Sequence, residues 1–363
     1  MRGKRLQLRA IVLVVAVNVL LTAGLVEIAL RLQQQFGPIY DLSVNREILS
    51  VELSELLNHV PAPGPDVDAN GIRKLDKPNS DGCGPRLLFL GDSFMQGLGP
   101  VDNIPYYVRR YFQQSLHREL CVFNAGVSSY SPSTFIPQAK KLIPLLKPDF
   151  VIIDVDETDL WDDYYRYRHL VVRDDGGSII AVRPTPLAVW FYDGLAKSTD
   201  NTLYIQRLVS KLYFTRIKFP KLYEQYWRGK PRDGLWLSRL PEAEARSAHA
   251  AEIAYFKTTL EDLTQTIVSR MGTADAVVYI HHPHLQHLGA AGAVFNHVVS
   301  DTVREIVSRH RVRFYDATGD LKTEFGVDPQ KYYVANDMHF NAAGTRAYGV
   351  AVAKYLAATL GLN

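Results

Sequence analysis

Three side chains in the sequence are of the types that make a serine nucleophile. Ser93 lies in the segment GDSF at 91–94, and Asp337 and His339 lie in NDMHFN at 336–341. A serine hydroxyl is weakly nucleophilic at neutral pH and needs a base to take its proton, and that base needs an orienting partner on its other ring nitrogen. These residues predict nucleophilic catalysis, with Ser93 as nucleophile, His339 as base and Asp337 as orienting acid.

Backbone donors for a developing oxyanion follow the ends of two neighbouring predicted strands. They are the N–H groups of Ser93 and of Gly126, the latter in the segment NAG at 124–126. N–H groups placed in this way stabilise the negative oxygen of a tetrahedral intermediate. Ser93 is not in a G-x-S-x-G pattern, which argues against the α/β-hydrolase version of this chemistry.

The elements that must position these residues are short apolar strands that alternate with longer amphipathic helices. The predicted strands are 87–90, 122–123, 150–155, 276–280 and 312–315. Between them, apolar residues recur at helical spacing, as in Ile253, Phe256, Leu260, Leu263 and Ile267, and in Phe295, Val299, Val303 and Ile306. This alternation predicts a parallel sheet with helices on both faces, and ligands bind such sheets at the carboxyl ends of the strands.

The third and fourth predicted strands are separated by about 120 residues, far more than a crossover helix needs. We therefore predict a partly helical insertion at about 160–245. Within it, residues 201–232 hold many basic side chains interleaved with aromatic ones: Arg207, Lys211, Arg216, Lys218, Lys221, Arg228, Lys230 and Arg232, with Tyr204, Tyr213, Phe214, Phe219, Tyr223, Tyr226 and Trp227. Such a patch suits an anionic membrane surface; glycan stacking and a helical cap that merely packs on the domain are the alternatives.

Four blocks, in this order along the chain, resemble the motifs of the SGNH (GDSL-type) hydrolases. They are GDSF at 91–94, NAGVSSYSP at 124–132, PDFVIIDVDETDLWDD at 148–163 and NDMHFNAAG at 336–344. More narrowly, the chain resembles membrane-anchored bacterial members, through Glu27 and Arg31 at the end of the apolar N-terminal segment and NGIR at 70–73. The resemblance implies a flavodoxin-like, three-layer α/β/α fold with a five-stranded parallel sheet.

The resemblance also implies roles for individual residues. Ser93 is implied as nucleophile, His339 as base, and Gly126 as second oxyanion donor. Two positions depart from the family pattern: Thr158 stands where the family has an oxyanion-hole Asn, and the acid lies two residues before the histidine, at Asp337, rather than three. Loss of one oxyanion donor costs two to three powers of ten in rate, so Thr158 either compensates or marks a slow or altered enzyme.

A run of histidines and a run of acids follow two of the predicted strands. His281, His282, His284 and His287 are dense enough to hold Zn²⁺; we predict a polar rim that contacts substrate, including Asn124, and neither a metal nor another cofactor. The carboxylates Asp154, Asp156, Glu157, Asp159, Asp162 and Asp163 offer Ca²⁺ ligands, and a solvated acidic loop is the favoured interpretation.

The N-terminus reads as a membrane anchor. Residues 1–9 are a basic tail and 10–31 an apolar stretch, of which the 17 residues from Ala10 to Val26 reach about 26 Å. The basic flank places the tail in the cytoplasm and the remaining residues across the inner membrane, in the bacterial periplasm. A cleaved signal peptide and a buried core helix are the alternatives. Residues 32–81, rich in Pro, Gly and polar residues, are predicted to be a linker to the hydrolase domain at 82–363.

Composition excludes several classes of protein. The chain has 363 residues, 41 basic and 38 acidic, with 47% hydrophobic residues, which excludes a disordered chain and gives no basic excess for nucleic-acid binding. Two cysteines exclude a disulfide-dense scaffold. Whether Cys83 and Cys121 are bridged stays open: measured back from the strand ends they are offset by roughly 16 Å, too far without a bend.

Together these observations favour a membrane-anchored serine esterase that removes an O-acyl group, such as acetyl, from an envelope glycan or lipid. An O-acyltransferase that acylates an envelope polysaccharide, with a membrane-bound O-acyltransferase as partner, is the close alternative, because the same acyl-enzyme can be resolved by a sugar hydroxyl. A non-catalytic envelope scaffold with the same fold is the third hypothesis. Neither the acyl chain nor the acceptor follows from the sequence.

Overall fold

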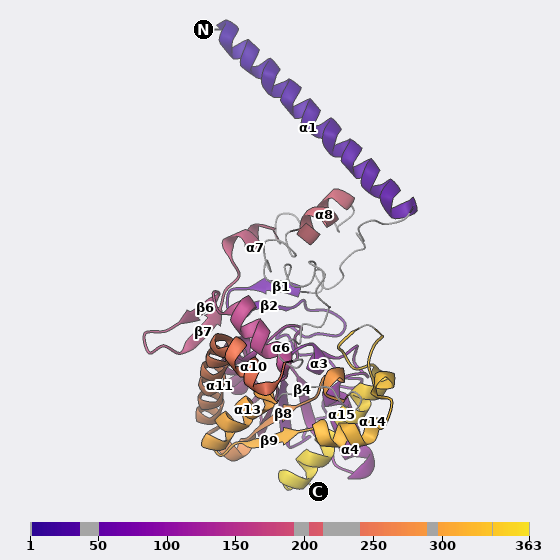
Figure 1. Ribbon diagram of the computed structural model, residues 1–363, viewed down its shortest axis with the longest axis vertical. Coiled ribbons are helices and arrows are strands. Elements are labelled where there is room, and N and C mark those ends of the chain that lie inside the picture. Colours follow the sequence, from indigo (N-terminus) through magenta and orange to yellow (C-terminus); the bar gives the residue numbers. More distant parts are fainter. Residues whose placement is uncertain are drawn as a thin grey trace. The chain divides into compact units, whose positions relative to one another are not determined.

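The computed structural model describes residues 2–36, 51–191, 203–212, 240–288, 297–335 and 337–362 (Figure 1). The chain divides into two compact units. The first comprises Met1–Val51 and Thr185–Lys230, and the second comprises Glu52–Pro184 and Pro231–Asn363. The second unit contains the sheet and all the predicted site residues.

A five-stranded parallel sheet forms the centre of the second unit. Its strands are β3 (Arg86–Leu90), β4 (Cys121–Asn124), β5 (Phe150–Asp154), β8 (Val277–His281) and β9 (Arg313–Asp316), in the order β4-β3-β5-β8-β9. The chain therefore reverses direction across the sheet after its first two strands, beside β3. This order, with helices on both faces, confirms the predicted flavodoxin-like α/β/α fold, and β3 and β5 lie next to the switch point where such sheets bind ligands.

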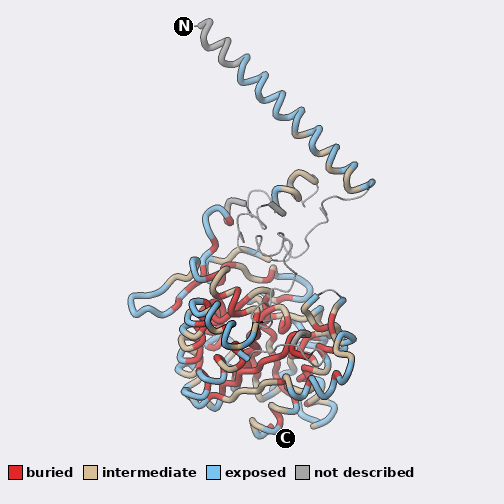
Figure 2. Tube along the Cα trace, viewed as in Figure 1, coloured by how far each residue is buried: buried red, intermediate tan, exposed pale blue. Residues whose placement is uncertain are grey.

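Alternate residues of each strand face two separate helical layers. Leu88 and Leu90 of β3 pack with α5 (Pro132–Leu146), α11 (Ala250–Met271) and α13 (Val298–Arg309). Leu87 and Phe89 pack with α4 (Ile104–Ser115), α14 (Thr318–Phe325) and α15 (Ala342–Thr359). Because successive strand side chains point to opposite faces, both layers need apolar residues and the strands are apolar throughout. Figure 2 shows this buried centre in red.

The helical spacing read from the sequence is confirmed in the two long helices of one layer. In α11 the buried residues include Ile253, Phe256, Leu260, Leu263 and Ile267, as predicted. In α13, Val299, Val303 and Ile306 are buried, whereas Phe295 lies outside the described residues.

Shorter elements connect the sheet to its helices. They are α3 (Ser93–Gln96), α6 (Glu157–Trp161), a π-helical turn (Asp162–Tyr167), the antiparallel pair β6 (Val171–Arg173) and β7 (Ile179–Val182), α10 (Glu242–Ala248), α12 (Leu285–Leu288), and 3₁₀ turns at Ala274–Ala276 and Pro329–Tyr332. The first two of these follow β3 and β5 directly, so they begin at the ligand-binding edge of the sheet.

In its described part from residue 51 onward, the predicted linker at 32–81 is wrong. Strands β1 (Val51–Ser54) and β2 (Asn58–Pro61) pair with each other, and the Arg73 N–H donates to the Asn124 carbonyl at the end of β4 (2.8 Å). Leu57 and Ile72 are buried in the layer that contains α5. The prediction of a linker rested on the Pro, Gly and polar composition of this segment. That composition gave no sign that Leu57, Ile72 and Leu75 are buried.

The first unit contains the apolar N-terminal helix. Helix α1 (Arg2–Phe36) is followed, within the described part of the unit, by α7 (Pro186–Phe191) and α8 (Tyr204–Leu212). The Glu27 carboxylate of α1 accepts hydrogen bonds from the backbone N–H groups of Tyr204 (3.0 Å) and Ile205 (2.9 Å) at the start of α8. Of the basic and aromatic patch predicted at 201–232, everything after Leu212 lies outside the described residues.

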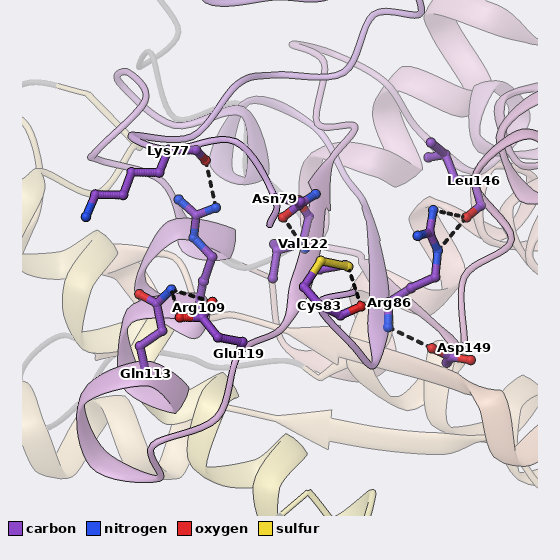
Figure 3. Close-up of a disulfide and its surroundings, with 11 residues drawn as sticks. Lys77, Asn79, Cys83, Arg86, Arg109, Gln113, Glu119, Val122, Leu146 and Asp149 are labelled. Atoms are coloured by element: carbon purple, nitrogen blue, oxygen red, sulfur yellow. Dashed lines mark hydrogen bonds between the residues drawn. A yellow bond between two sulfur atoms is a disulfide. The ribbon is translucent and has the colours of Figure 1, made fainter. Parts of the chain in front are cut away.

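Cys83 and Cys121 form a disulfide, with their Cα atoms 5.2 Å apart (Figure 3). The offset measured back from the strand ends misjudged the register. Cys121 is the first residue of β4 and pairs with Arg86, the first residue of β3. Cys83 therefore lies only three residues before Arg86, the residue opposite Cys121. The turn that precedes β3 brings the two cysteines together.

Candidate active site

Ser93 lies at the point where β3 gives way to helix α3. Asp92 caps this helix, since its Oδ1 accepts the N–H of Phe94 at 2.8 Å. A side chain at Gly91 would meet Met95 Cβ at 2.6 Å, so a residue without a side chain is needed for the strand to turn directly into the helix. The sharp turn holds the Ser93 hydroxyl at the carboxyl edge of the sheet.

The structure brings Ser93, His339 and Asp337 into one hydrogen-bonded series. His339 Nε2 lies 2.8 Å from Ser93 Oγ, and His339 Nδ1 lies 2.6 Å from Asp337 Oδ1. The same Asp337 oxygen accepts the backbone N–H of His339 (3.1 Å). Burial alone would raise the pKa of Asp337, but these two hydrogen bonds and the charge of the imidazolium hold it below its usual value. This is the geometry in which a base takes a serine proton while a carboxylate fixes its tautomer.

The loop that carries the histidine is fixed on both sides. Tyr333 and Phe340 form a β-bridge around it, and Asn341 caps α15 by accepting the N–H groups of Ala343 and Gly344. The residue that contacts the imidazole is Asp337, two positions before His339. Asn336, three positions before His339, lies outside the described residues. The side chains of His339 and Asp337 are 33% and 46% exposed, so the base is open to solvent.

Asp92, which the sequence did not single out, is a second hydrogen-bond acceptor for Ser93. Its Oδ2 lies 3.2 Å from Ser93 Oγ and 3.4 Å from Thr158 Oγ1. The signal available in the sequence was its position directly before the nucleophile, where an acidic N-cap is common. Asp92 therefore links the serine to the loop after β5.

The three predicted oxyanion donors differ in what they bind. Ser93 lies in the first turn of α3, where backbone N–H groups lack intrahelical partners. The Gly126 N–H donates to Asn124 Oδ1 at 2.9 Å, and the Thr158 hydroxyl donates to Asp156 Oδ1 at 2.6 Å. An oxyanion that used the Gly126 or Thr158 donor would have to displace these acceptors.

Gly126 has a packing role that its predicted chemistry did not include. A Cβ at this position would lie 2.4 Å from the Gln96 backbone nitrogen and 2.7 Å from the Met95 carbonyl carbon. The loop after β4 thus passes directly against the backbone of α3, and Asn124 joins the two by donating to the Met95 carbonyl (3.1 Å). Glycine is required here by close approach, since neither contact can move without displacing the helix that carries Ser93.

The solvated acidic loop predicted after β5 is wrong. Five of its six carboxylates are buried: Asp154, Asp156, Glu157, Asp159 and Asp163. Asp156 and Asp159 form a capping box at the start of α6, in which each carboxylate accepts a backbone N–H of the other residue. The D-x-x-D spacing before an apolar residue was the sequence signal for this box.

The polar rim predicted from Asn124, His281, His282 and His284 is wrong as well, because all four side chains are at most 5% exposed. His281 Nδ1 bonds to the Val155 carbonyl (2.8 Å). His282 and His284 turn towards Asp154 and Asp156 instead of solvent. A strand end in a parallel sheet is covered by the loops around it, and polar residues there pair with one another rather than with water.

Burial and mutual charge set the ionisation of this cluster. Burial alone would lower the pKa of His282, but Asp154 and Asp156 raise it to about 10. Burial alone would raise the pKa of Asp156, yet His284 and His282 hold it well below its usual range. For Asp92, burial raises the pKa well above its usual value, and the negative charges of Asp156 and Asp154 raise it further. The carboxyl next to Ser93 is therefore harder to ionise than an exposed aspartate.

The ring of Phe94 lies between the buried histidines and the exposed one. Its centroid is 4.1 Å from that of His282 and 5.0 Å from that of His339. Phe94 directly follows Ser93 in the chain, so the residue next to the serine also packs against the His339 ring. The buried cluster and the triad thus share one apolar wall.

Several solved structures are similar to this chain at low sequence identity. A two-domain esterase active on acetylated mannans is 15% identical with a TM-score of 0.41, over 77% of this chain and 50% of that protein, so the chain spans about half its length. A lipase/acylhydrolase from Enterococcus faecalis is 14% identical with a TM-score of 0.40, over 75% of this chain and 95% of the other. An acetylxylan esterase from Geobacillus stearothermophilus is 15% identical with a TM-score of 0.41, over 77% and 95%. Neither a protein-family model nor a curated protein matches the sequence.

The sheet order and the position of the serine agree with the architecture that the sequence motifs imply. Ser93 follows β3, His339 precedes the last helix, and the five strands have the flavodoxin-like order. The chain has a flavodoxin-like α/β/α fold, and it carries a serine, a histidine and an aspartate in hydrogen-bonded sequence at the edge where such sheets bind ligands.

Proposed function

We propose that the chain is a membrane-anchored serine esterase that removes an O-acyl group, acetyl in the first instance, from an envelope glycan or lipid. The observation that carries this proposal is the series from Ser93 Oγ through the His339 ring to the Asp337 carboxylate, with separations of 2.8 and 2.6 Å. A non-catalytic scaffold has no need of this alignment.

In the proposed reaction, Ser93 Oγ attacks the ester carbonyl carbon while its proton passes to His339 Nε2. The tetrahedral oxyanion is held by backbone N–H groups at the start of α3. The C–O bond to the leaving alcohol then breaks as His339 returns the proton to that oxygen, which leaves an acyl-enzyme on Ser93. Water, deprotonated by His339, then attacks the acyl carbon; the bond from that carbon to Ser93 Oγ breaks, His339 returns the proton to Oγ, and the carboxylic acid is released.

The apolar helix α1 supports the membrane part of the proposal. Residues Ala10–Phe36 are long and apolar enough to cross a bilayer, with a mean hydropathy of 2.5 in the most apolar window, and side chains such as Leu13 and Leu20 are 65% and 72% exposed. With the basic tail in the cytoplasm, the hydrolase unit lies in the periplasm, attached to the inner membrane. Its substrates are then acylated envelope molecules.

A fluorophosphonate probe tests the enzyme against the scaffold. The full chain in detergent is expected to be labelled at Ser93, and the Ser93→Ala variant is expected to lose both labelling and the hydrolysis of p-nitrophenyl acetate. Ser128→Ala provides a matched control, because it removes a hydroxyl from the neighbouring loop and keeps the backbone N–H that donates to Gln96 Oε1. Equal hydrolysis by wild type and Ser93→Ala would refute the esterase proposal.

An O-acyltransferase is the second candidate, and the exposure of the base favours it. His339 is 33% exposed on the side chain, so a sugar hydroxyl can reach it as water does and resolve the same acyl-enzyme. A membrane-bound O-acyltransferase would be its donor-side partner. Measuring acetate release from p-nitrophenyl acetate with and without a previously de-acetylated envelope polysaccharide separates the two: transfer lowers free acetate and adds acetyl groups to the glycan, whereas hydrolysis leaves both unchanged.

A further inference from the structure

Two imidazoles and one carboxylate converge in the buried cluster next to Ser93. Asp156 follows β5, while His282 and His284 follow β8, and the three side chains are at most 1% exposed. His284 Nε2 lies 2.8 Å from Asp156 Oδ2, and His282 Nε2 lies 3.3 Å from the same oxygen. One ligand atom from each residue lies within 4.8 Å of the other two.

Asp156 is oriented by bonds to its other oxygen. Oδ1 accepts the backbone N–H of Thr158 (2.7 Å), the Thr158 hydroxyl (2.6 Å) and, at 3.4 Å, the N–H of Asp159. These capping bonds fix the carboxylate plane. Oδ2 is left directed at the two imidazoles.

The His282 ring is held from its far side by a second carboxylate. Nδ1 lies 3.2 Å from Asp154 Oδ1, which also accepts the hydroxyl of Tyr348 at 2.9 Å. A histidine that ligates a metal through one ring nitrogen usually donates its other N–H to a carboxylate, which fixes the tautomer and ring orientation. Asp154 and Tyr348 supply this outer arrangement for Nε2 of His282.

A neutral His282 ring would direct a lone pair at a carboxylate. In the tautomer whose Nδ1–H donates to Asp154, Nε2 is an acceptor, and it faces another acceptor, Asp156 Oδ2. Within the part of the chain that the structure describes, this Nε2 is a buried atom without a hydrogen-bond partner. Buried acceptors that face one another need a positive species between them, either a proton on the imidazole or a cation shared with His284.

We propose that Asp156, His282 and His284 bind one zinc ion through Oδ2 and the two Nε2 atoms. A tetrahedral ion with ligand bonds of 2.0–2.2 Å needs donor atoms roughly 3.3 Å apart, and the Nε2 atoms of His284 and His282 lie 2.8 and 3.3 Å from Asp156 Oδ2. Two imidazole nitrogens with a carboxylate suit zinc, whereas Ca²⁺ and Mg²⁺ prefer oxygen ligands alone. The sequence signal is the pair of histidines around Pro283, two positions apart.

The ion would hold two loops together, and with three protein ligands its fourth position would be left to a water molecule. The ligands are buried, and the Phe94 ring, 4.1 Å from the His282 ring, separates them from His339. Bound zinc would tie the loop after β5 to the loop after β8, and so fix Thr158 and the wall beneath Phe94. The inference does not depend on the esterase proposal, because zinc content is measured without a substrate.

Metal content tests the site directly. The full chain in detergent is saturated with Zn²⁺, freed of excess by gel filtration and analysed by inductively coupled plasma mass spectrometry. We expect about one zinc per chain, and a rise in Tm on adding Zn²⁺ to chelator-treated protein. Cobalt in place of zinc is expected to give the visible absorption of a tetrahedral ion. Less than a tenth of an ion per chain, with an unchanged Tm, would show that protons alone neutralise the cluster and would overturn the proposal.

Variants locate the ion. His282→Gln and His284→Gln are expected to lower zinc affinity at least tenfold, and Asp154→Asn to lower it between ten- and a hundredfold by releasing the ring orientation. His310→Gln is the matched control, since His310 pairs with Glu261 away from the cluster, and it is expected to retain the ion. Retention of one zinc by both cluster variants would place the ion elsewhere and refute the site. If a variant does not fold, the wild-type measurement still decides.

Discussion

His339 Nε2 lies 2.8 Å from Ser93 Oγ although the two residues are 246 positions apart in the chain. The sheet makes this possible, because β3 delivers the serine and the loop before α15 delivers the histidine to the same edge. Asp337, two residues before the histidine, completes the series at 2.6 Å. Asp337 is therefore placed beside His339 by its position in the chain, whereas Ser93 is placed there by the fold of the sheet.

The first prediction concerns Asp337. Asp337→Asn keeps the shape of the side chain but removes the charge and lets the imidazole adopt the wrong tautomer, so kcat for p-nitrophenyl acetate is expected to fall by about 10²–10⁴, with KM little changed. Asp328→Asn, on the exposed turn before the same loop, is the control and is expected to be fully active. Unchanged kcat in Asp337→Asn would assign the orienting role to another residue.

The second prediction is a pH dependence of stability from the same carboxylate. Its hydrogen bonds to His339 lower its pKa in the folded state below the ordinary 3.8, so its contribution is present above about pH 4 and disappears as the pH falls through the lowered pKa. The Tm difference between wild type and Asp337→Asn is therefore expected to be present above about pH 4 and to shrink as the pH falls through the lowered pKa. A difference that grows on acidification would contradict this sign. Because the side chain is half exposed, the difference is expected to be small.

The third prediction concerns Gly126. In Gly126→Ala, the new methyl group would lie 2.4 Å from the Gln96 nitrogen, which pushes the loop after β4 away from α3. Overpacking of this kind costs about 1–3 kcal/mol in the free energy of unfolding, and displacement of α3 is expected to lower activity by more than the stability loss explains. Gly319→Ala, where nothing lies within 4 Å of the added atom, is the matched control. Chemical denaturation and esterase assays on the same preparations separate the two effects.

The sequence predicted what is local or periodic and missed what depends on burial. Strand ends, the helical spacing in α11 and the D-x-H triplet are short-range patterns, and the structure has them, with the strand ends within one residue of the predicted positions. Asp156 and His282 were misjudged as exposed because polar residues at loop positions are usually solvated; their pairing joins positions on different strands, which one sequence does not reveal. The disulfide was left open for the related reason that register, here Arg86 opposite Cys121, is a property of two strands together.

The fourth prediction concerns the Cys83–Cys121 disulfide, which closes a segment with a sequence separation of 38. Removing a cross-link over this length costs about 3–4 kcal/mol in the chain-entropy account. Cys83→Ala/Cys121→Ala is therefore expected to unfold at lower urea concentration than wild type, while reductant shifts the wild type to the same midpoint and leaves the double variant unchanged. Equal midpoints for oxidised and reduced wild type would show that the bridge does not stabilise the domain.

The fifth prediction concerns Asp163, which is fully buried and joins three elements. Its Oδ1 accepts the Ser131 hydroxyl (2.6 Å) and the Ser133 N–H (2.8 Å) at the start of α5, and its Oδ2 accepts the Thr259 hydroxyl of α11. Burial raises the pKa of this carboxyl despite these bonds, so the negative charge itself contributes little to the stability of the folded state. Its acceptor oxygens are what the fold uses.

Asp163→Asn and Asp163→Ala separate the two properties. Asn keeps one oxygen for Ser131 and Ser133, and Thr259 can still donate to the Tyr255 carbonyl (3.1 Å), so a loss below about 1 kcal/mol is expected. Ala leaves buried donors without an acceptor, which costs about 2–4 kcal/mol. Urea denaturation of both variants measures the difference. An Asn variant as unstable as the Ala variant would show instead that the buried negative charge itself stabilises the junction of α5 and α11.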